Sequence, residues 1–154
     1  MPTIKELERE VMQEFSELEN WEERYEYLIE LGQEMPEMDA AYKNDENLVK
    51  GCQSSVWFAI KCKDGELLLD ADSDSLIVKG IVAVLQRLLS GQPAAAIREA
   101  DLKIFEDLGL WKHLSSQRST GVASIMAHLK AAAEDCRETS ALEDAADKDR
   151  FTGG

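Results

Sequence analysis

The chain has 154 residues, a net charge of −14 and 44% hydrophobic residues. That length and apolar content are typical of a single compact domain with a hydrophobic core. The charge disfavours nucleic acids and anionic membrane surfaces as partners, because both would repel the protein. Self-repulsion of this size is also typical of proteins that work in concentrated salt, so a halophilic source is a second interpretation of the acidity.

The sequence contains no pattern for membrane insertion or secretion. No apolar run approaches the roughly 18 residues that span a bilayer, and the N-terminal stretch MPTIKELERE is charged. We therefore expect a cytoplasmic protein. The three cysteines, Cys52, Cys62 and Cys136, are widely spaced and include no CxxC pair. This spacing argues against a disulfide framework or a zinc site and favours a reducing compartment.

Two amphipathic helices are predicted at the start of the chain. Thr3 followed by Glu6 is a capping-box pattern, and apolar residues at helical spacing come after it. Asn20 followed by Glu23 predicts the start of the second helix, which is expected to end at Gly32. A polar connection follows.

A β-hairpin is predicted in the middle of the chain, where the period of the apolar residues changes to two. One strand face consists of Val56, Phe58, Ile60 and Cys62. The Asp-Gly pair at 64–65 predicts a tight turn, and residues 66–71 (ELLLDA) form the partner strand. Residues 47–49 are a candidate for a short third strand.

Helices are predicted for the rest of the chain. A largely buried helix ends before Gly91, another starts at Pro93, and a short one ends at Gly109. The apolar face of a last long helix consists of Val122, Ile125, Met126, Leu129, Ala133 and Cys136. Residues 1–138 are therefore expected to form one α+β domain with helices packed on a small antiparallel sheet. Residues 139–154 are polar and are expected to form a flexible acidic tail.

Among the cysteines, Cys52 is the candidate for chemistry. Cys62 and Cys136 lie on apolar faces and are interpreted as core residues. Cys52 instead follows Gly51 in a polar loop outside any periodic segment, where an accessible thiol can react. Trp57 is interpreted mainly as a packing residue, with binding as the second interpretation.

Four segments resemble, in the same order, the signatures of the SufE family of sulfur acceptors that serve cysteine desulfurases in iron–sulfur cluster assembly. They are NWEERYEYLIELGQEMPE, NLVKGCQSSVWF, ADSDSLIVKGIVAVL and LGLWKHLSSQRSTGVASIM. The resemblance implies the SufE/IscU-like α+β fold. It also implies that Cys52 takes sulfane sulfur from a pyridoxal-phosphate-dependent, SufS-like cysteine desulfurase, holds it as a covalent persulfide, and passes it to an iron–sulfur cluster scaffold complex.

The resemblance implies further site residues around Cys52. Those expected to shape the loop or to bind the partner are Gly51, Gln53, Ser54, Trp57, Asp72, Asp74 and Arg118. No metal and no resident cofactor are implied, and the protein is an accessory protein rather than an autonomous enzyme. A monomer and a homodimer are both compatible with the sequence. Ser55 and Ser116 depart from the glutamine and proline usual in the family, which bears on loop dynamics or partner choice.

Two other classes of function are open. An iron–sulfur or zinc scaffold needs several thiolates at one site, which conflicts with two core cysteines. A cysteine hydrolase needs His113 or His128 within hydrogen-bond reach of Cys52, and no motif indicates such a pair. Arg118 and Lys79 are cations that would lower the thiol pKa if they lay beside Cys52.

Overall fold

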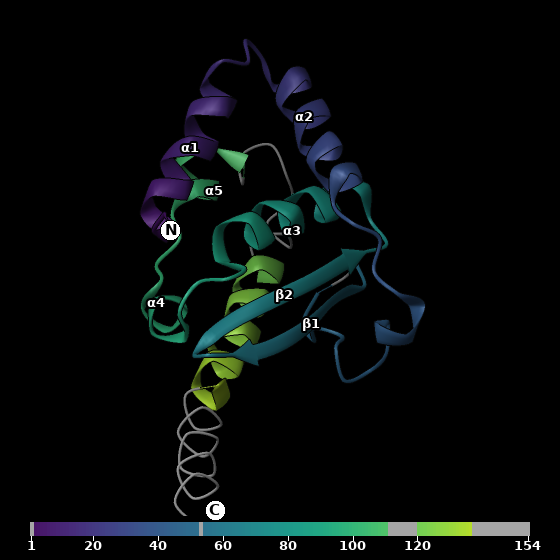
Figure 1. Ribbon diagram of the computed structural model, residues 1–154. Helices are drawn as coiled ribbons and strands as arrows, with labels where there is room; N and C mark the ends of the chain where they lie inside the picture. The colour runs from purple at the N-terminus through teal and green to yellow at the C-terminus, as the bar shows by residue number, and fades with distance from the viewer. Residues whose placement is uncertain (1, 53, 111–119, 137–154) are drawn as a thin grey trace, which may run out of the picture.

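The computed structural model describes residues 2–52, 54–110 and 120–136 (Figure 1). In chain order its elements are α1 (Ile4–Ser16), α2 (Trp21–Glu34), the 3-10 helix η1 (Ala40–Tyr42), β1 (Val56–Lys63), β2 (Glu66–Ser73), α3 (Leu76–Leu89), α4 (Ala94–Glu99) and α5 (Ile104–Asp107). Residues 120–136 are helical and are called the last helix below. The predicted α+β class is confirmed. The expected tail, residues 139–154, lies outside the described part of the chain.

The helices begin and end at the residues whose side chains suit those positions. Thr3 and Asn20 accept hydrogen bonds from the backbone N–H three residues further on, at 3.2 and 3.0 Å, and so cap α1 and α2. Ser75 caps α3 in the same way. Pro93 precedes α4, and α5 is followed by Gly109 in the left-handed conformation with φ 73°.

The hairpin forms at the predicted turn. Asp64 and Gly65 have φ values of 53° and 78°, and positive φ at both central residues is typical of the two-residue turn that matches the twist of antiparallel strands. In the paired strands, Trp57 lies opposite Asp72. The predicted third strand is reduced to one bridge between Leu48 and Trp57, because the chain leaves the sheet directly afterwards in a loop.

Helix α3 is the centre of the fold, since it packs against both α2 and β2. Helices α2 and α3 cross closely because each has a glycine at the point of contact. A Cβ atom on Gly80 would lie 2.2 Å from the backbone oxygen of Leu28, and one on Gly32 would lie 2.8 Å from the nitrogen of Gly80. Gly32 therefore does not end α2, as the sequence suggested, but lies inside it and allows the two backbones to touch.

The last helix passes behind the hairpin in Figure 1 and contributes to the core through Ile125, Leu129 and Ala133, which are all buried. Together with apolar side chains of α3 and of the two strands, these residues form one continuous hydrophobic cluster. The cluster fixes the last helix relative to the hairpin, and this arrangement positions the site described below.

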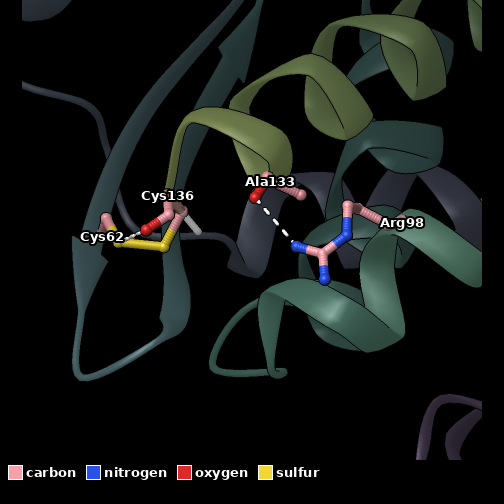
Figure 2. Close-up of a disulfide and its surroundings, with 4 residues drawn as sticks. All are labelled: Cys62, Arg98, Ala133 and Cys136. Atoms are coloured by element: carbon pink, nitrogen blue, oxygen red, sulfur yellow. Dashed lines mark hydrogen bonds between the residues drawn. A yellow bond between two sulfur atoms is a disulfide. The ribbon is translucent and has the colours of Figure 1, made fainter. Parts of the chain in front are cut away.

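Cys62 and Cys136 form a disulfide, so the prediction of two separate core thiols is wrong (Figure 2). Their Cα atoms lie 5.4 Å apart although 74 positions separate them in the sequence. Periodicity placed each cysteine on an apolar face, but it does not say which two faces meet. They meet because the last helix crosses the hairpin near the turn, where Cys62 lies. Cys52 is left as the free thiol.

Candidate functional site

Cys52 lies in a short loop whose two ends are held together. The backbone N–H of Val49 donates to the oxygen of Val56 at 2.8 Å, and the bridge between Leu48 and Trp57 lies next to this bond. The described residues between Val49 and Val56 therefore lie in a loop outside the paired strands. A loop with a closed base can change its conformation without disturbing the strands that carry it.

Gly51 allows the loop to turn and to approach the last helix closely. Its φ of 95° is a conformation that other residues rarely adopt. A Cβ atom at this position would lie 2.5 Å from the hydroxyl oxygen of Ser124. Both observations require glycine directly before Cys52, as the sequence analysis expected.

The thiol of Cys52 is sheltered by the last helix. Its Sγ atom donates a hydrogen bond to the backbone oxygen of Gly121 over 3.6 Å, and the residue is half-buried against the hydrophobic core. A Cβ atom on Gly121 would lie 3.8 Å from this sulfur. Because Gly121 has no side chain, the sulfur lies directly against the backbone of the last helix.

Burial raises the pKa of the Cys52 thiol above its usual range. The cations that the sequence analysis considered do not offset this effect within the described residues: Lys79 is ion-paired with Asp72 at 3.3 Å, and Arg118 lies outside them. The covered thiol is therefore protonated at neutral pH and weakly nucleophilic. The conformation seen here covers the sulfur and so lowers its reactivity relative to an exposed thiol.

The raised pKa predicts how Cys52 responds to pH. Only the thiolate reacts with iodoacetamide, so the alkylation rate of Cys52 in the folded protein should reach its midpoint above the usual pKa of 9.0. In urea, with the disulfide intact, the midpoint should return to that usual value. Because the folded state binds this proton more tightly, stability should fall as pH rises from the unfolded towards the folded pKa. A folded midpoint at or below the unfolded one would contradict a sheltered thiol.

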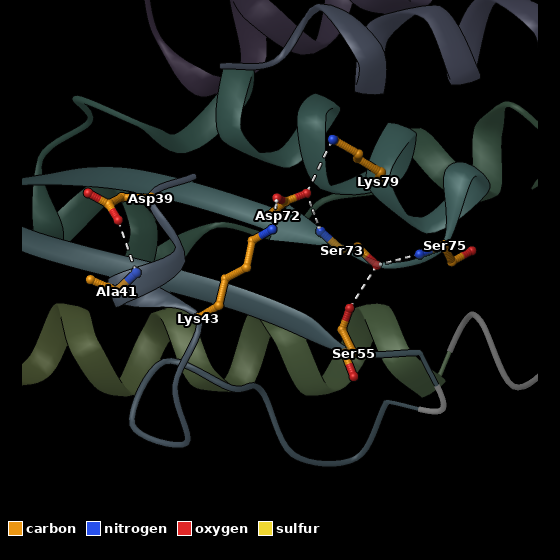
Figure 3. Close-up of polar contacts among 8 residues, drawn as sticks. All are labelled: Asp39, Ala41, Lys43, Ser55, Asp72, Ser73, Ser75 and Lys79. Carbon is orange, nitrogen blue, oxygen red and sulfur yellow. Dashed lines mark hydrogen bonds and ion pairs between the residues drawn. The ribbon is translucent and has the colours of Figure 1, made fainter. Parts of the chain in front are cut away.

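Asp74 holds the other end of the loop through the backbone of Ser55. The backbone N–H of Ser55 donates to the Asp74 carboxylate at 3.0 Å, and the N–H of Asp74 donates to the Ser55 carbonyl at 3.2 Å. The hydroxyl of Ser73 donates to the same carbonyl at 2.8 Å (Figure 3). All three contacts use the backbone of Ser55. They therefore do not depend on its side chain, which differs from the glutamine usual at this position in the resembling family.

Asp72 is buried among cations of its own chain (Figure 3). Its carboxylate lies 2.9 Å from the ammonium of Lys43 and 3.3 Å from that of Lys79, and it accepts from the N–H of Ser73 at 2.8 Å. Burial alone would raise the pKa of Asp72, but these donors together lower it. Lys43 also lies 5.7 Å from the ring centre of Trp57. Partner binding by Asp72 and Trp57 stays a prediction.

The other predicted residues are placed as follows. Ser54 is half-buried in the loop beside Cys52. Outside the described residues lie Gln53, His113, Ser116 and Arg118. The sequence analysis did not single out Gly121 or Ser124, two residues of the last helix that lie against the loop. Both belong to the fourth signature segment, which was the available signal.

The structure also bears on the alternative functions. Cys62 and Cys136 are bonded to each other and cannot act as thiolate ligands beside Cys52. In the described part of the chain, no group of three or more His, Cys, Asp or Glu residues is arranged to hold a metal ion. His128 has a pKa lowered by burial, and the hydrogen bond of Cys52 goes to a backbone carbonyl instead. Within the same residues, no helix is long and apolar enough to cross a membrane.

Known proteins are similar to this chain in sequence and in fold. Residues 9–133 match SufE, described as an Fe-S metabolism associated domain. An uncharacterized SufE-like protein of Rhizobium meliloti is 40% identical over 130 residues, which cover 81% of this chain and 93% of the relative. A SufE-like protein of Rhizobium etli is 39% identical over 126 residues, covering 79% and 85%.

A solved structure agrees with the fold. The solution structure of a hypothetical protein from Thermus thermophilus aligns with a TM-score of 0.71 at 19% identity and covers 86% of this chain and 96% of its own. At that identity the match shows the fold alone. The family match, by contrast, extends over most of the sequence and includes the Cys52 loop, both strands and most of the last helix. The chain belongs to the SufE family and is associated with Fe-S metabolism.

Proposed function

We propose that the protein is a sulfur carrier in which Cys52 accepts sulfur from a cysteine desulfurase and delivers it to an iron–sulfur cluster scaffold complex. The donor is a SufS-like, pyridoxal-phosphate-dependent enzyme, which this protein stimulates by removing its product sulfur. The carrier needs no cofactor of its own and works in the cytoplasm. The observation that carries the proposal is the free thiol of Cys52, which a loop with hydrogen-bonded ends holds against the last helix.

The transfer is a thiol exchange that balances without an added oxidant. The Cys52 thiolate attacks the outer sulfur of the persulfide on the desulfurase, so that a new S–S bond forms on Cys52. The old S–S bond breaks, and the donor cysteine leaves as a thiolate. Delivery to the scaffold repeats the exchange in the opposite sense, with Cys52 as the leaving thiolate.

The sheltered position of Cys52 suits the chemistry of the product. A persulfide in free solution is attacked by other thiols and is readily oxidised. Over Gly121 the sulfur lies beside a backbone carbonyl and the edge of the core. The same site therefore protects the sulfur between partners, while the closed loop base allows Cys52 to move out when a partner binds.

A side chain at position 121 should affect the persulfide form of Cys52 more than the thiol form. A second sulfur extends about 2 Å beyond Sγ, whereas a Cβ atom on Gly121 would already lie 3.8 Å from Sγ. Gly121→Ala should therefore keep the thiol form folded but displace the outer sulfur from its shelter. We expect dithiothreitol to remove sulfur from the persulfidated variant several times faster than from the wild type, measured by intact mass over time.

The matched variant for this comparison is Ala133→Ser on the same helix, at a buried position about 18 Å from Gly121 along the helix axis. It should leave the persulfide lifetime unchanged even if stability falls. Equal lifetimes for wild type and Gly121→Ala would show that the outer sulfur is not held over Gly121.

The direct test of the function uses the full chain with a purified cysteine desulfurase and cysteine. Mass spectrometry should show one added sulfur atom per chain, located on the peptide that contains Cys52, and cysteine turnover by the desulfurase should rise when the protein is present. A rise in desulfurase turnover without added sulfur on Cys52 would instead indicate that the protein activates the enzyme by binding to it. The absence of both effects with several desulfurases would overturn the proposal.

A further inference from the structure

The disulfide and the shelter of Cys52 lie on the same helix. At one end of the last helix, Gly121 accepts the hydrogen bond from Cys52 at 3.6 Å. Near the other end, Cys136 is bonded to Cys62 of β1 (Figure 2). With a rise of 1.5 Å per residue, these two ends are about 22 Å apart along the helix axis. A covalent bond at one end therefore restrains the element that covers the thiol at the other.

The last helix has other anchors that do not depend on the disulfide. Ile125, Leu129 and Ala133 are buried in the core. The guanidinium of Arg98 in α4 donates to the backbone oxygen of Ala133 at 3.2 Å (Figure 2). It also pairs with Glu134 at 3.5 Å. Breaking the disulfide should therefore leave the helix docked but less restrained, so that the protein has two folded states.

The two cysteines differ in their access to reagents. Cys62 is half-buried, whereas Cys136 is 2% exposed. A thiolate from solution is expected to attack the sulfur of Cys62, and Cys136 then leaves as the thiolate. The Cys62 sulfur also lies 3.4 Å from the backbone oxygen of Cys136, which gives the reduced Cys62 thiol a nearby hydrogen-bond acceptor. Both redox states can thus be accommodated locally.

The compartment argues that this bond is reversible. Disulfides that occur in reducing compartments are usually transient, and serve catalysis or redox sensing. This step rests on the proposed function, since a cytoplasmic location is part of it. A permanent structural disulfide would be unexpected in the cytoplasm. A disulfide that forms and breaks as the thiol–disulfide balance changes is consistent with that compartment.

We propose that the Cys62–Cys136 pair is a redox site that controls how readily Cys52 leaves its shelter. As a disulfide, the pair restrains the last helix and keeps Cys52 covered; as a dithiol, it allows the helix and loop to open more often. A low-molecular-mass dithiol reduces the bond by supplying two electrons and two protons and becomes a disulfide itself. A low-molecular-mass disulfide reverses the step and is reduced to two thiols.

The test measures access to Cys52 and needs no desulfurase. The full chain is treated with the thiol oxidant diamide or with a phosphine reductant, freed of reagent, and alkylated with iodoacetamide while the rate at Cys52 is followed by peptide mass spectrometry. We expect one titratable thiol per chain after oxidation and three after reduction. The rate at Cys52 should be several-fold higher in the reduced protein. Circular dichroism should show both forms folded.

The matched control is the double variant Cys62→Ser, Cys136→Ser, which cannot form the bond. Its Cys52 should react at the fast rate under both treatments. Three outcomes would each overturn the redox site. They are a Cys52 alkylation rate in the reduced wild type that is no higher than in the oxidised wild type, three titratable thiols after oxidation, and unfolding of the protein on reduction. Sulfur acceptance by Cys52 is measured separately, so failure here and failure of the carrier function are distinguishable.

Discussion

Cys52→Ser should abolish sulfur acceptance while leaving the fold intact. The hydroxyl of serine replaces a thiol of similar size in a half-buried loop position, so stability should change by less than about 0.5 kcal/mol. It cannot form an S–S bond, so no added sulfur should be found by mass spectrometry. Desulfurase turnover with this variant should equal turnover without any carrier. The loss is complete because the other cysteines are not near the loop.

The double variant Cys62→Ser, Cys136→Ser gives the opposite result. It should still acquire one sulfur on Cys52 but lose stability, because the disulfide closes a loop of 74 positions and bonds of that span contribute about 4 kcal/mol. Domains of this size are stable by roughly 5–15 kcal/mol, so the variant should remain folded at room temperature. If Cys52→Ser still accumulated a persulfide on Cys62 or Cys136, those residues would be the sulfur acceptors.

Gly80→Ala should destabilise the protein by about 3 kcal/mol, near the upper end for overpacking. The new Cβ atom would lie 2.2 Å from the backbone oxygen of Leu28 and 2.7 Å from its Cγ atom. The oxygen belongs to α2 itself, so no side-chain rotation can relieve the contact and the two helices must separate. Urea denaturation should show a lower midpoint with an unchanged slope.

Gly121→Ala is the matched glycine substitution for stability. Among the residues that the structure describes, its new Cβ atom would meet the Cys52 sulfur alone, at an ordinary contact distance of 3.8 Å. Alanine also favours helix over glycine by about 1 kcal/mol. This variant should be as stable as the wild type or slightly more so. Equal denaturation midpoints for Gly80→Ala and the wild type would contradict the close crossing of α2 and α3.

The elements of the fold were largely predictable because their signals are local. The caps at Thr3, Asn20 and Ser75 and the turn at Asp64–Gly65 each depend on a few adjacent residues. The end of α2 was wrongly predicted at Gly32 because a glycine near a helix end is compatible with two different structures. It can stop a helix or admit a neighbouring backbone, and only the position of α3 decides between them.

The site was predictable in part. The position of Cys52 after a glycine, in a segment with its own signature, is enough to indicate a reactive loop. The residues that cover Cys52 and the disulfide were not predicted, since each contact joins residues about seventy positions apart: 69 from Cys52 to Gly121 and 74 from Cys62 to Cys136. Such contacts follow from how the last helix packs on the hairpin, which periodicity along one segment does not determine.

The closed base of the loop sets the depth to which the protein can deliver or collect sulfur. Cys52 is three residues from Val49, whose hydrogen bond to Val56 at 2.8 Å fixes the start of the loop. A fully extended chain spans about 3.3–3.6 Å per residue, so the Cα atom of Cys52 can move no more than roughly 10 Å from that point. A donor or acceptor whose sulfur lies deeper than this below its surface, allowing for one cysteine side chain, cannot exchange with this protein.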